Sequence, residues 1–367
     1  MLAQAERTTG KDTERYFWAH AVKDGRDTNP VLLSNDSLVE RGLQGFLDFL
    51  ADNSTETKQP LPLPQITPNP EIVQWAKTSL ASAGLVAKLA KDKAAAEAKV
   101  IAEAKVIAEA KAEAERVAAA KLQLETDKEE RRRRTAGEAW AVEGVGLVLV
   151  PIAGGTFSMG SRSGGSDEQP VTVVTLSPFW LAKTEVTQAQ WEAVMGSNPS
   201  YFKGGQLPVE RVSWDDAMEF CRKLTERERQ AGRLPTGTIY TLPTEAQWEY
   251  ACRAGTTGDY AGEVDAMAWY DKNSGAATHE VGTKQANAWG LHDMHGNVWE
   301  WCLDRYGPYW GGRVTDPKGV PSGSLRVYRG GSWNRLAINA RSAARYRSNP
   351  DYRSIHIGFR PARSSVP

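Results

Sequence analysis

The stretch from Gly290 to Cys302 limits what this chain can fold into more than any other part of the sequence. It reads Gly-Leu-His-Asp-Met-His-Gly-Asn-Val-Trp-Glu-Trp-Cys, and so combines glycines, carboxylates and two tryptophans. Glycine lets the backbone turn tightly, whereas each tryptophan needs a large buried pocket and a partner for its N–H group. The stretch therefore predicts the centre of a compact, turn-rich domain.

The carboxylates of this stretch have two open roles. Asp293 and Glu300, with the carbonyl groups of Gly296 and Val298 between them, offer the hard oxygen ligands that calcium prefers. The same carboxylates could instead accept hydrogen bonds from the backbone N–H groups of a tight turn. We predict one calcium ion at most.

Composition and charge exclude several classes of protein. The 367 residues suggest two or three segments, and 41% hydrophobic with 25% charged residues is ordinary for a globular chain. The formal net charge is zero, so the chain as a whole attracts neither nucleic acid nor an anionic membrane. The three cysteines, Cys221, Cys252 and Cys302, form neither a disulfide framework nor a CxxC zinc motif. With no apolar signal region and no run of ~18 apolar residues, we expect a cytoplasmic protein without membrane contact.

Shifts in composition predict four segments. Residues 1–59 include an apolar pattern at helical spacing from Ser37 to Leu50, which predicts a small helical segment of unassigned role. Residues 60–70 contain five prolines and predict a semi-rigid linker. Residues 71–135 are rich in Ala, Glu and Lys, which are strong helix formers, and predict a long helical stalk. Residues 136–367 are the expected domain.

A six-residue repeat runs through the predicted stalk, with Ala96 to Ile101 followed by Ala102 to Ile107. Lys-Glu pairs four residues apart, such as Lys99 with Glu103, support a helix. Six residues rotate a helix by roughly 120° from its starting face, so the Val-Ile pairs form no straight coiled-coil seam. We expect a stalk that self-associates loosely or binds a partner, rather than a long dimeric zipper.

The pattern after residue 136 predicts the α+β class. Gly146 to Ser161 alternates β-forming residues with turn glycines, as in a hairpin, and Thr172 to Trp180 reads as a further strand. Short strands and glycine-rich turns are expected after Gly255. Three helices with Ser or Thr start signals are predicted, at Thr187 to Met195, Ser213 to Gln230 and Thr244 to Ala254.

Seven short motifs follow one another along residues 145–363. In order they are Gly154 to Ser161, Thr184 to Thr187, Pro208 to Trp214, Leu242 to Ala251, Gly290 to Trp301, Arg329 to Trp333 and Gly358 to Arg360. Together they resemble the formylglycine-generating, or sulfatase-modifying-factor, family. The resemblance implies a C-type-lectin-like fold with little regular secondary structure, which the long Ala/Glu/Lys-rich helix precedes here. It also implies a calcium site on the segment that matches Asp293, Gly296, Val298 and Glu300.

The enzymes of that family oxidise a substrate cysteine to formylglycine, using copper(I) held by two cysteines shortly after the Arg-Gly-Gly-Ser-aromatic motif. Soft thiolates suit copper(I), so other side chains do not replace them. The matching positions here are Arg335 and Ala340, and no cysteine follows Cys302. We therefore expect no copper, and a formylglycine-generating oxidoreductase is kept only as the alternative function.

Nine arginines and a single acidic residue, Asp351, lie between Arg326 and Arg363. Arginine pairs with phosphate and stacks on bases, so nucleic-acid binding is one interpretation. The favoured interpretation is structural, with arginines at motif positions holding carboxylates and turn carbonyls inside the domain. These arginines are Arg329, Arg341, Arg345 and Arg360.

The residues between the Arg-Gly-Gly-Ser-Trp and Gly-Phe-Arg-Pro-Ala words are rich in Asn, Ser, Tyr and Arg, which adaptable binding surfaces favour. They resemble the variable region of the C-type-lectin-type target proteins of diversity-generating retroelements. The resemblance implies a non-catalytic scaffold that binds a protein or other macromolecular ligand through this segment. The predicted contact residues are Asn334, Arg335, Leu336, Ile338, Asn339, Tyr346, Arg347, Asp351, Tyr352, Arg353, Ser354 and His356.

Overall fold

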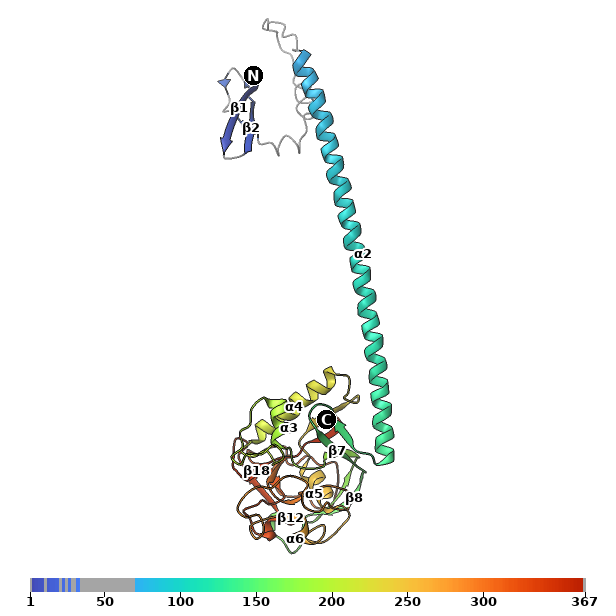
Figure 1. The fold of residues 1–367 in the computed structure, drawn as a ribbon, viewed down its shortest axis with the longest axis vertical. Helices are drawn as coiled ribbons and strands as arrows, with labels where there is room; N and C mark the ends of the chain where they lie inside the picture. Colours follow the sequence, from blue (N-terminus) through green and yellow to red (C-terminus); the bar gives the residue numbers. More distant parts are fainter. Residues whose placement is uncertain are drawn as a thin grey trace. The chain divides into compact units, whose positions relative to one another are not determined.

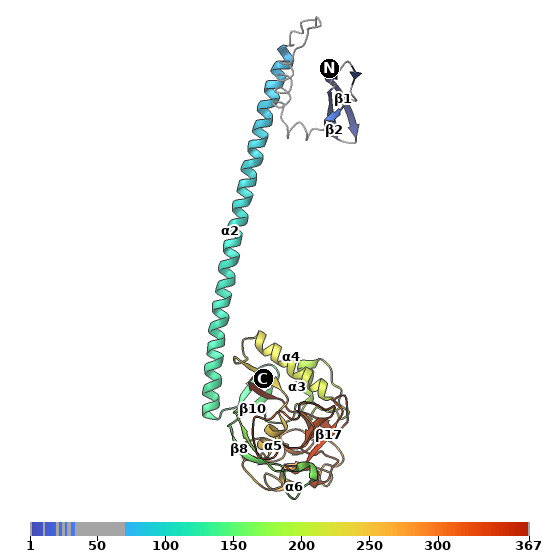
Figure 2. The same ribbon diagram turned by 180° about the vertical axis from the view of Figure 1, so that it is seen from behind.

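The computed structural model describes residues 2–9, 12–19, 22–23, 26–27, 31–33 and 70–365. Figures 1 and 2 show the ribbon from opposite sides. The chain divides into two compact units, residues 1–113 and residues 114–367. Among the described residues, no helix has the length and apolar character needed to cross a membrane.

The described residues before position 34 form short strands. β2 pairs antiparallel with β1 and β5, while β3 pairs with β4. The bounds are β1 (Leu2–Thr9), β2 (Asp12–Ala19), β3 (Val22–Lys23), β4 (Arg26–Asp27) and β5 (Val31–Leu33). Threonine and aromatic residues in β1 and β2 favour pleated backbone, and the register of the two strands runs from Leu2 with Ala19 to Thr9 with Asp12. The predicted helix from Ser37 to Leu50 and the linker residues 60–69 lie outside the described residues.

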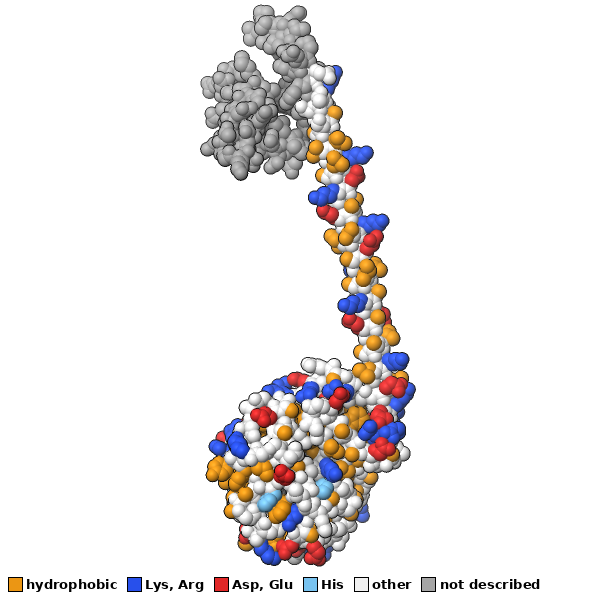
Figure 3. All heavy atoms as spheres, in the orientation of Figure 1, with side chains coloured by type: hydrophobic (Ala, Val, Ile, Leu, Met, Phe, Trp, Pro, Cys, Tyr) orange, Lys and Arg blue, Asp and Glu red, His pale blue; other side chains and the backbone are white. Residues whose placement is uncertain are grey.

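The predicted stalk is one continuous helix, α2 (Pro70–Ala136), about 100 Å long at ~1.5 Å per residue. Ion pairs four residues apart join Lys99 to Glu103 and Lys105 to Glu109 at 4.0 Å. Figure 3 shows charged and apolar side chains interspersed along the helix. Val100, Ile101 and their repeat equivalents are strongly exposed, as the rotating repeat requires. The helix is confirmed, and its self-association stays a prediction.

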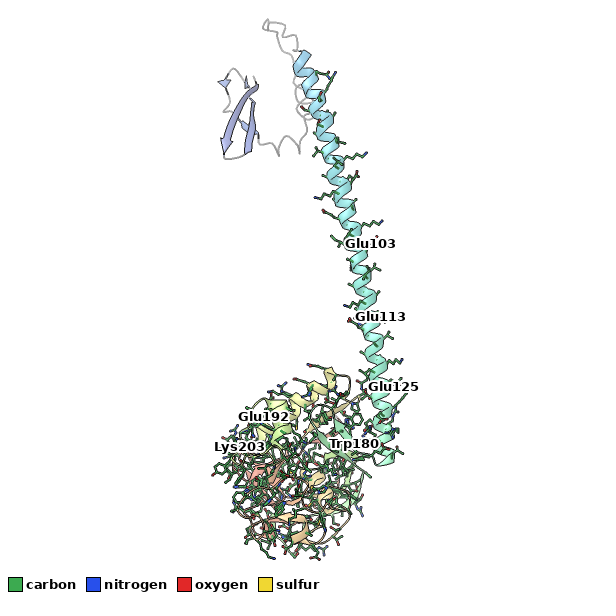
Figure 4. The ribbon with its side chains drawn as sticks, viewed as in Figure 1. Glu103, Glu113, Glu125, Trp180, Glu192 and Lys203 are labelled. Carbon is green, nitrogen blue, oxygen red and sulfur yellow. The ribbon has the colours of Figure 1, made fainter. Side chains whose placement is uncertain are left out.

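The last turns of α2 belong to the second unit, which begins at Ala114 rather than near residue 136. The Asp127 carboxylate accepts from the backbone N–H and the hydroxyl of Thr236, both at 2.8 Å. The Trp180 indole donates to Glu130 at 2.9 Å, and Glu130 is buried. Figure 4 labels Trp180 on the domain and Glu125 on the adjoining turns of α2. These polar contacts, which a helical repeat cannot reveal, extend the domain into the stalk.

Gly146 to Ser161 forms one arm of a long bent hairpin instead of a hairpin by itself. β7 (Leu147–Ile152) pairs antiparallel with β10 (Phe179–Ala182), and β8 (Gly155–Met159) pairs antiparallel with β9 (Thr172–Leu176). The arms change sheets near Gly154, where an added Cβ would lie 2.6 Å from the Leu176 carbonyl oxygen. The close approach of the two backbones at this bend explains why glycine stands there.

The remaining strands complete a set of small sheets around the bent hairpin. Their bounds are β6 (Trp140–Val142), β11 (Thr238–Thr241), β12 (Ala268–Trp269), β13 (His295–Gly296), β14 (Trp299–Arg305), β15 (Arg313–Thr315), β16 (Arg326–Arg329), β17 (Arg345–Ser348), β18 (Ile357–Gly358) and β19 (Ala362–Ser365). In the described part of the domain, one sheet has the order β11-β19-β10-β7-β6 and another the order β17-β16-β14-β18. β15 joins β9 and β8, and β12 pairs with β13.

The three predicted helices form within one residue of their expected ends. They are α3 (Gln188–Met195), α4 (Trp214–Gln230) and α5 (Glu245–Arg253). Thr187, Ser213 and Thr244 are the N-caps, and each takes part in a reciprocal capping box. The short elements α6 (Val264–Met267), η1 (Ser166–Glu168) and η2 (Ala337–Ala340) complete the domain. The α+β class is confirmed.

Two clusters of buried side chains fill the domain. One contains Trp180, Phe220, Trp299, Trp301 and Phe359, and the other is built around Trp248, Phe179 and Met294. The indole N–H groups of Trp301 and Trp248 donate to the Val212 carbonyl at 3.0 Å and to Glu300 at 2.7 Å. The Gly290 to Cys302 stretch therefore lies at the centre of the domain, as predicted.

Candidate ligand-recognition surface

A fully buried ion pair joins the central stretch to the last motif. Arg360 donates through Nε and Nη2 to the two carboxylate oxygens of Glu300, both at 2.6 Å, and neither side chain is exposed. Arg360 also donates to the backbone carbonyl of His292 at 2.8 Å. This bidentate pair fixes β14 against the segment that follows β18.

Two further buried carboxylates lie near this pair. Glu185 accepts from the backbone N–H of Val298 at 2.9 Å and from the Asn297 side chain at 2.7 Å. Burial, reinforced by the charges of Asp293 and Glu300, raises the pKa of Glu185 well above its ordinary value. Asp293 accepts from the backbone N–H of Gly282 at 2.7 Å through one oxygen, and its other oxygen is buried without a partner in the described structure.

One of the predicted calcium ligands, Glu300, is engaged by an arginine in this arrangement. Both oxygens of Glu300 are taken by the Arg360 guanidinium, which places a positive charge where the cation would have to lie. The backbone N–H of Val298 donates to the Glu185 carboxylate at 2.9 Å. Within the described residues, no three His, Cys, Asp or Glu side chains are grouped as metal ligands. The geometry favours the alternative in which these carboxylates satisfy internal donors.

Removal of calcium tests this assignment. Because Arg360 already neutralises Glu300, we expect excess EDTA to leave the melting temperature of the purified protein unchanged by differential scanning calorimetry. A ligand that binds only the folded state raises stability by mass action. A melting temperature that falls on chelation and returns when calcium is added back would restore the calcium prediction.

The buried arginines of the C-terminal segment hold carboxylates and carbonyls, which confirms their structural interpretation. Arg345 forms a bidentate pair with Glu245, at 2.7 and 2.8 Å, and Arg341 pairs with Glu168 at 2.6 Å. Arg329 bridges two acidic residues of α5, Glu245 and Glu249, and lies 2.6 Å from each carboxylate. These arginines are therefore not free to bind phosphate.

The twelve predicted contact residues, in contrast, all lie at the surface. Nine are exposed, and Asn339, Ser354 and His356 are partly exposed. Leu336 directly precedes η2 and is 62% exposed, and Ile338 lies within η2 and is 60% exposed. Exposed apolar side chains that lie close together are available as contacts for a ligand.

Tyr328, on β16, was not predicted and packs against one of these residues, Tyr346. Its ring stacks on that of Tyr346 at 6.1 Å and meets Trp299 edge-on at 5.2 Å. Burial, followed by the charge of Tyr352, raises the pKa of Tyr328 to about 12. We call the surface made by the twelve predicted residues and Tyr328 the recognition surface.

Polar contacts connect the rest of the recognition surface. Ser354 and His356 are hydrogen-bonded at 2.9 Å, and burial followed by the charge of Arg335 lowers the pKa of His356 to about 4. The Asn339 amide donates to the Tyr346 hydroxyl at 2.5 Å. Arg353 does not project freely, because Asp216 of α4 accepts from it at 2.8 and 2.9 Å. Arg335 therefore offers a more available charge to a ligand than Arg353.

An aromatic ladder outside the C-terminal segment also reaches the recognition surface. The ring of Phe202 lies 5.1 Å from that of Tyr201 and 5.5 Å from that of Trp333, whose indole donates to the Ile355 carbonyl. Tyr201 exposes 61% of its side chain. A pattern search of the C-terminal segment misses this contribution, because its loop precedes the surface by more than a hundred residues. The sequence signal for this contribution was a Tyr-Phe pair between a proline and two glycines, which indicates aromatic residues in a loop.

All three cysteines are buried and unpaired. Burial raises the pKa of Cys252 to about 12 and raises the pKa values of Cys221 and Cys302. Cys252 lies 3.7 Å from Nε2 of His295, but burial lowers the pKa of that imidazole to about 4. A neutral thiol beside a neutral imidazole is neither a good nucleophile nor a copper ligand.

The positions aligned with the copper-binding cysteines offer no soft ligand. Arg335 is exposed on the recognition surface, and Ala340 is buried at the end of η2. The Ala340 carbonyl accepts a hydrogen bond from Nδ1 of His295 at 2.7 Å. The loop thus retains the family's backbone position without the thiolates that copper(I) requires.

Comparison with known proteins agrees with this geometry. Residues 142–365 match the family described as the sulfatase-modifying factor enzyme 1-like domain. The chain is 35% identical over 232 residues to the chaperone protein LppX of Paenibacillus barcinonensis, a match covering 50% of this chain and 78% of that protein. It is 32% identical over 215 residues to the formylglycine-generating enzyme of Mus musculus, covering 53% of each. The chain thus spans about half the length of that enzyme.

Among solved structures, the domain resembles variable protein 1 of Treponema denticola. The two share 33% sequence identity with a TM-score of 0.56. The match covers 61% of this chain and 98% of the other. The C-type-lectin-like fold inferred from the motifs is consistent with this similarity.

Proposed function

Since this chain belongs to the family of the sulfatase-modifying factor enzyme 1-like domain, we propose that it is a non-catalytic binding protein whose lectin-like scaffold presents a C-terminal recognition surface. The observation that carries the proposal is the division within one segment. Three of its motif arginines, Arg329, Arg345 and Arg360, are buried in ion pairs, while nine of the twelve predicted contact residues are exposed. Such a scaffold keeps its fold when the exposed residues change.

The chemistry of the recognition surface suits a protein ligand. Tyrosines supply rigid contact area with a polar tip, and Leu336 and Ile338 supply apolar anchors. Arg335 and Arg347 add positive charge, so a ligand surface with apolar and acidic groups would complement it. A cavity of about 440 Å³, lined by Arg211, Arg353 and Trp191 among others, offers room for a projecting side chain.

Similarity to the variable protein of Treponema denticola supports a related role. On this proposal the chain is a variable protein of a diversity-generating retroelement, and its exposed C-terminal residues are the ones rewritten. The alternative, a formylglycine-generating oxidoreductase, is less well supported. All three thiols are buried, and the two aligned positions are Arg335 and Ala340.

A binding screen tests the role of the recognition surface. Folded domains displayed on phage are selected on the immobilised protein, and each binder is titrated by calorimetry. Interface hot spots typically contribute 2 kcal/mol or more, so Tyr346→Ala with Tyr352→Ala should weaken binding by about 30-fold. Both side chains are more than a third exposed, so the melting temperature should hardly change.

Trp310→Ala is the matched control, because it removes an exposed aromatic side chain outside the recognition surface. It should leave affinity for the selected domains unchanged. Binders that tolerate the double tyrosine variant but are lost with Trp310→Ala would place recognition elsewhere on the domain.

A further inference from the structure

A second concave site lies apart from the recognition surface. It has a volume of about 880 Å³ and is formed by β8, the turn after it, the C-terminal end of α5 and the following loop, together with Trp289. None of the twelve predicted contact residues lines it. A cleft of this size accommodates a ligand of two or three sugar rings or of similar bulk.

Three aromatic side chains form one wall of the cleft. The rings of Phe157 and Tyr250 are 5.2 Å apart, and those of Tyr250 and Trp289 are 4.8 Å apart. All three are partly exposed. The arrangement depends on Gly155, because an added Cβ there would lie 2.2 Å from the Tyr250 hydroxyl. The glycine lets the hydroxyl end of Tyr250 approach β8 closely.

Hydroxyl groups also line the cleft. Ser161 comes from the turn after β8, and Thr256 and Thr257 come from the loop after α5. Thr257 is exposed, so its hydroxyl group can reach a ligand. Each hydroxyl both donates and accepts a hydrogen bond, which matches the alternating donor and acceptor character of a polyol.

The charges lining the cleft nearly cancel. Arg253 is buried and committed, since it donates to Glu249 at 2.9 Å and to the carbonyl groups of Gly258 and Gly160. Arg162 and Asp259 are exposed and opposite in sign. The lining therefore gives no strong preference to phosphate or to a cation. A wholly apolar ligand would leave the hydroxyl groups of the cleft without hydrogen-bond partners.

We propose that this cleft binds the neutral rings of an oligosaccharide, with the apolar face of one ring on Trp289 and Tyr250 and its hydroxyl groups bonded to Thr257. Aromatic rings and hydroxyl groups in one cleft provide both interactions that a sugar ring needs. The site adds a ligand of different chemistry to a protein whose recognition surface takes a macromolecule.

The test is a glycan array probed with the full-length protein, followed by titration calorimetry with the best neutral oligosaccharide. Trp289→Ala should lower affinity at least tenfold, and Trp289→Phe should retain most of it. Thr257→Ala changes an exposed loop residue and cannot unfold the domain, so it should also weaken binding, by several-fold.

Tyr346→Ala is the matched control on the recognition surface and should leave glycan affinity unchanged. The proposal is overturned if no neutral glycan binds, if only sulfated or sialylated glycans bind, or if Tyr346→Ala abolishes binding while Trp289→Ala does not. Each result is independent of whether selected protein domains bind the recognition surface.

Discussion

Replacing Arg360 with methionine is expected to lower the free energy of unfolding by about 3–5 kcal/mol. Arg360 is fully buried and makes both of its shortest hydrogen bonds to Glu300. Methionine fills a similar volume but leaves the Glu300 carboxylate without its counter-charge. The buried carboxylates of Glu185 and Asp293 make ionisation there still less favourable. Urea denaturation followed by tryptophan fluorescence measures the loss.

Arg347→Met is the matched control for this prediction. Arg347 also lies in the C-terminal segment, but its side chain is 48% exposed and its ion pair with Asp167 is long, at 4.0 Å. Its loss should therefore cost less than about 1 kcal/mol. Adding Glu300→Gln to Arg360→Met removes the unpaired charge and should recover part of the stability. Equal effects of the two single variants would contradict the division between a buried ionic scaffold and an exposed surface.

Replacing Asp304 with asparagine is expected to change how stability depends on pH. Asp304 is buried and accepts from the backbone N–H of Glu245 at 2.8 Å. Burial, followed by the charge of Glu245, raises the pKa of Asp304 to about 8. The folded protein therefore keeps a proton that the unfolded chain releases above about pH 4. The contribution of this group to the free energy of unfolding is complete below about pH 4. It falls by about 1.4 kcal/mol per pH unit between pH 4 and pH 8, and it is fully lost above that range.

Asparagine retains an acceptor for the Glu245 N–H and carries no charge, so the variant should gain stability relative to the original protein as the pH rises. The difference between the two should reach several kcal/mol at pH 8 and nearly vanish at pH 4. Chemical denaturation at four pH values from 4 to 8 measures it, and other titrating groups cancel in the difference. Parallel pH profiles for the two proteins would show that Asp304 is ionised in the folded state.

The local elements of the fold could be predicted from the sequence, because their causes are local. Thr187, Ser213 and Thr244 cap their helices through contacts three residues away, and the Ala/Glu/Lys composition determines α2. The bent hairpin and the docking of α2 could not be predicted. They depend on long-range contacts, such as Trp180 with Glu130, that no local pattern encodes.

The exposure of the charged and amide residues among the predicted contacts was predictable, because such side chains are rarely buried, and their binding role stays a prediction. The pairing of the arginines was predictable only in kind, since Arg360 and Glu300 are sixty residues apart in the sequence. The same separation hides from the sequence that Arg360 pairs with Glu300, one of the predicted calcium ligands. Tyr328 and Tyr201 were missed because strand alternation and a distant loop, rather than the composition of the C-terminal segment, place them at the surface.

The most direct test of the central claim, that the domain binds without catalysing, is an oxidation assay. The purified protein is incubated with a cysteine-containing sulfatase peptide, copper(I) and oxygen, and the peptide is analysed by mass spectrometry. A formylglycine-generating enzyme with both copper-binding cysteines serves as the positive control. The buried, protonated thiols and the Arg335 and Ala340 positions predict no aldehyde product. Repeated turnover of the peptide to formylglycine would contradict the account.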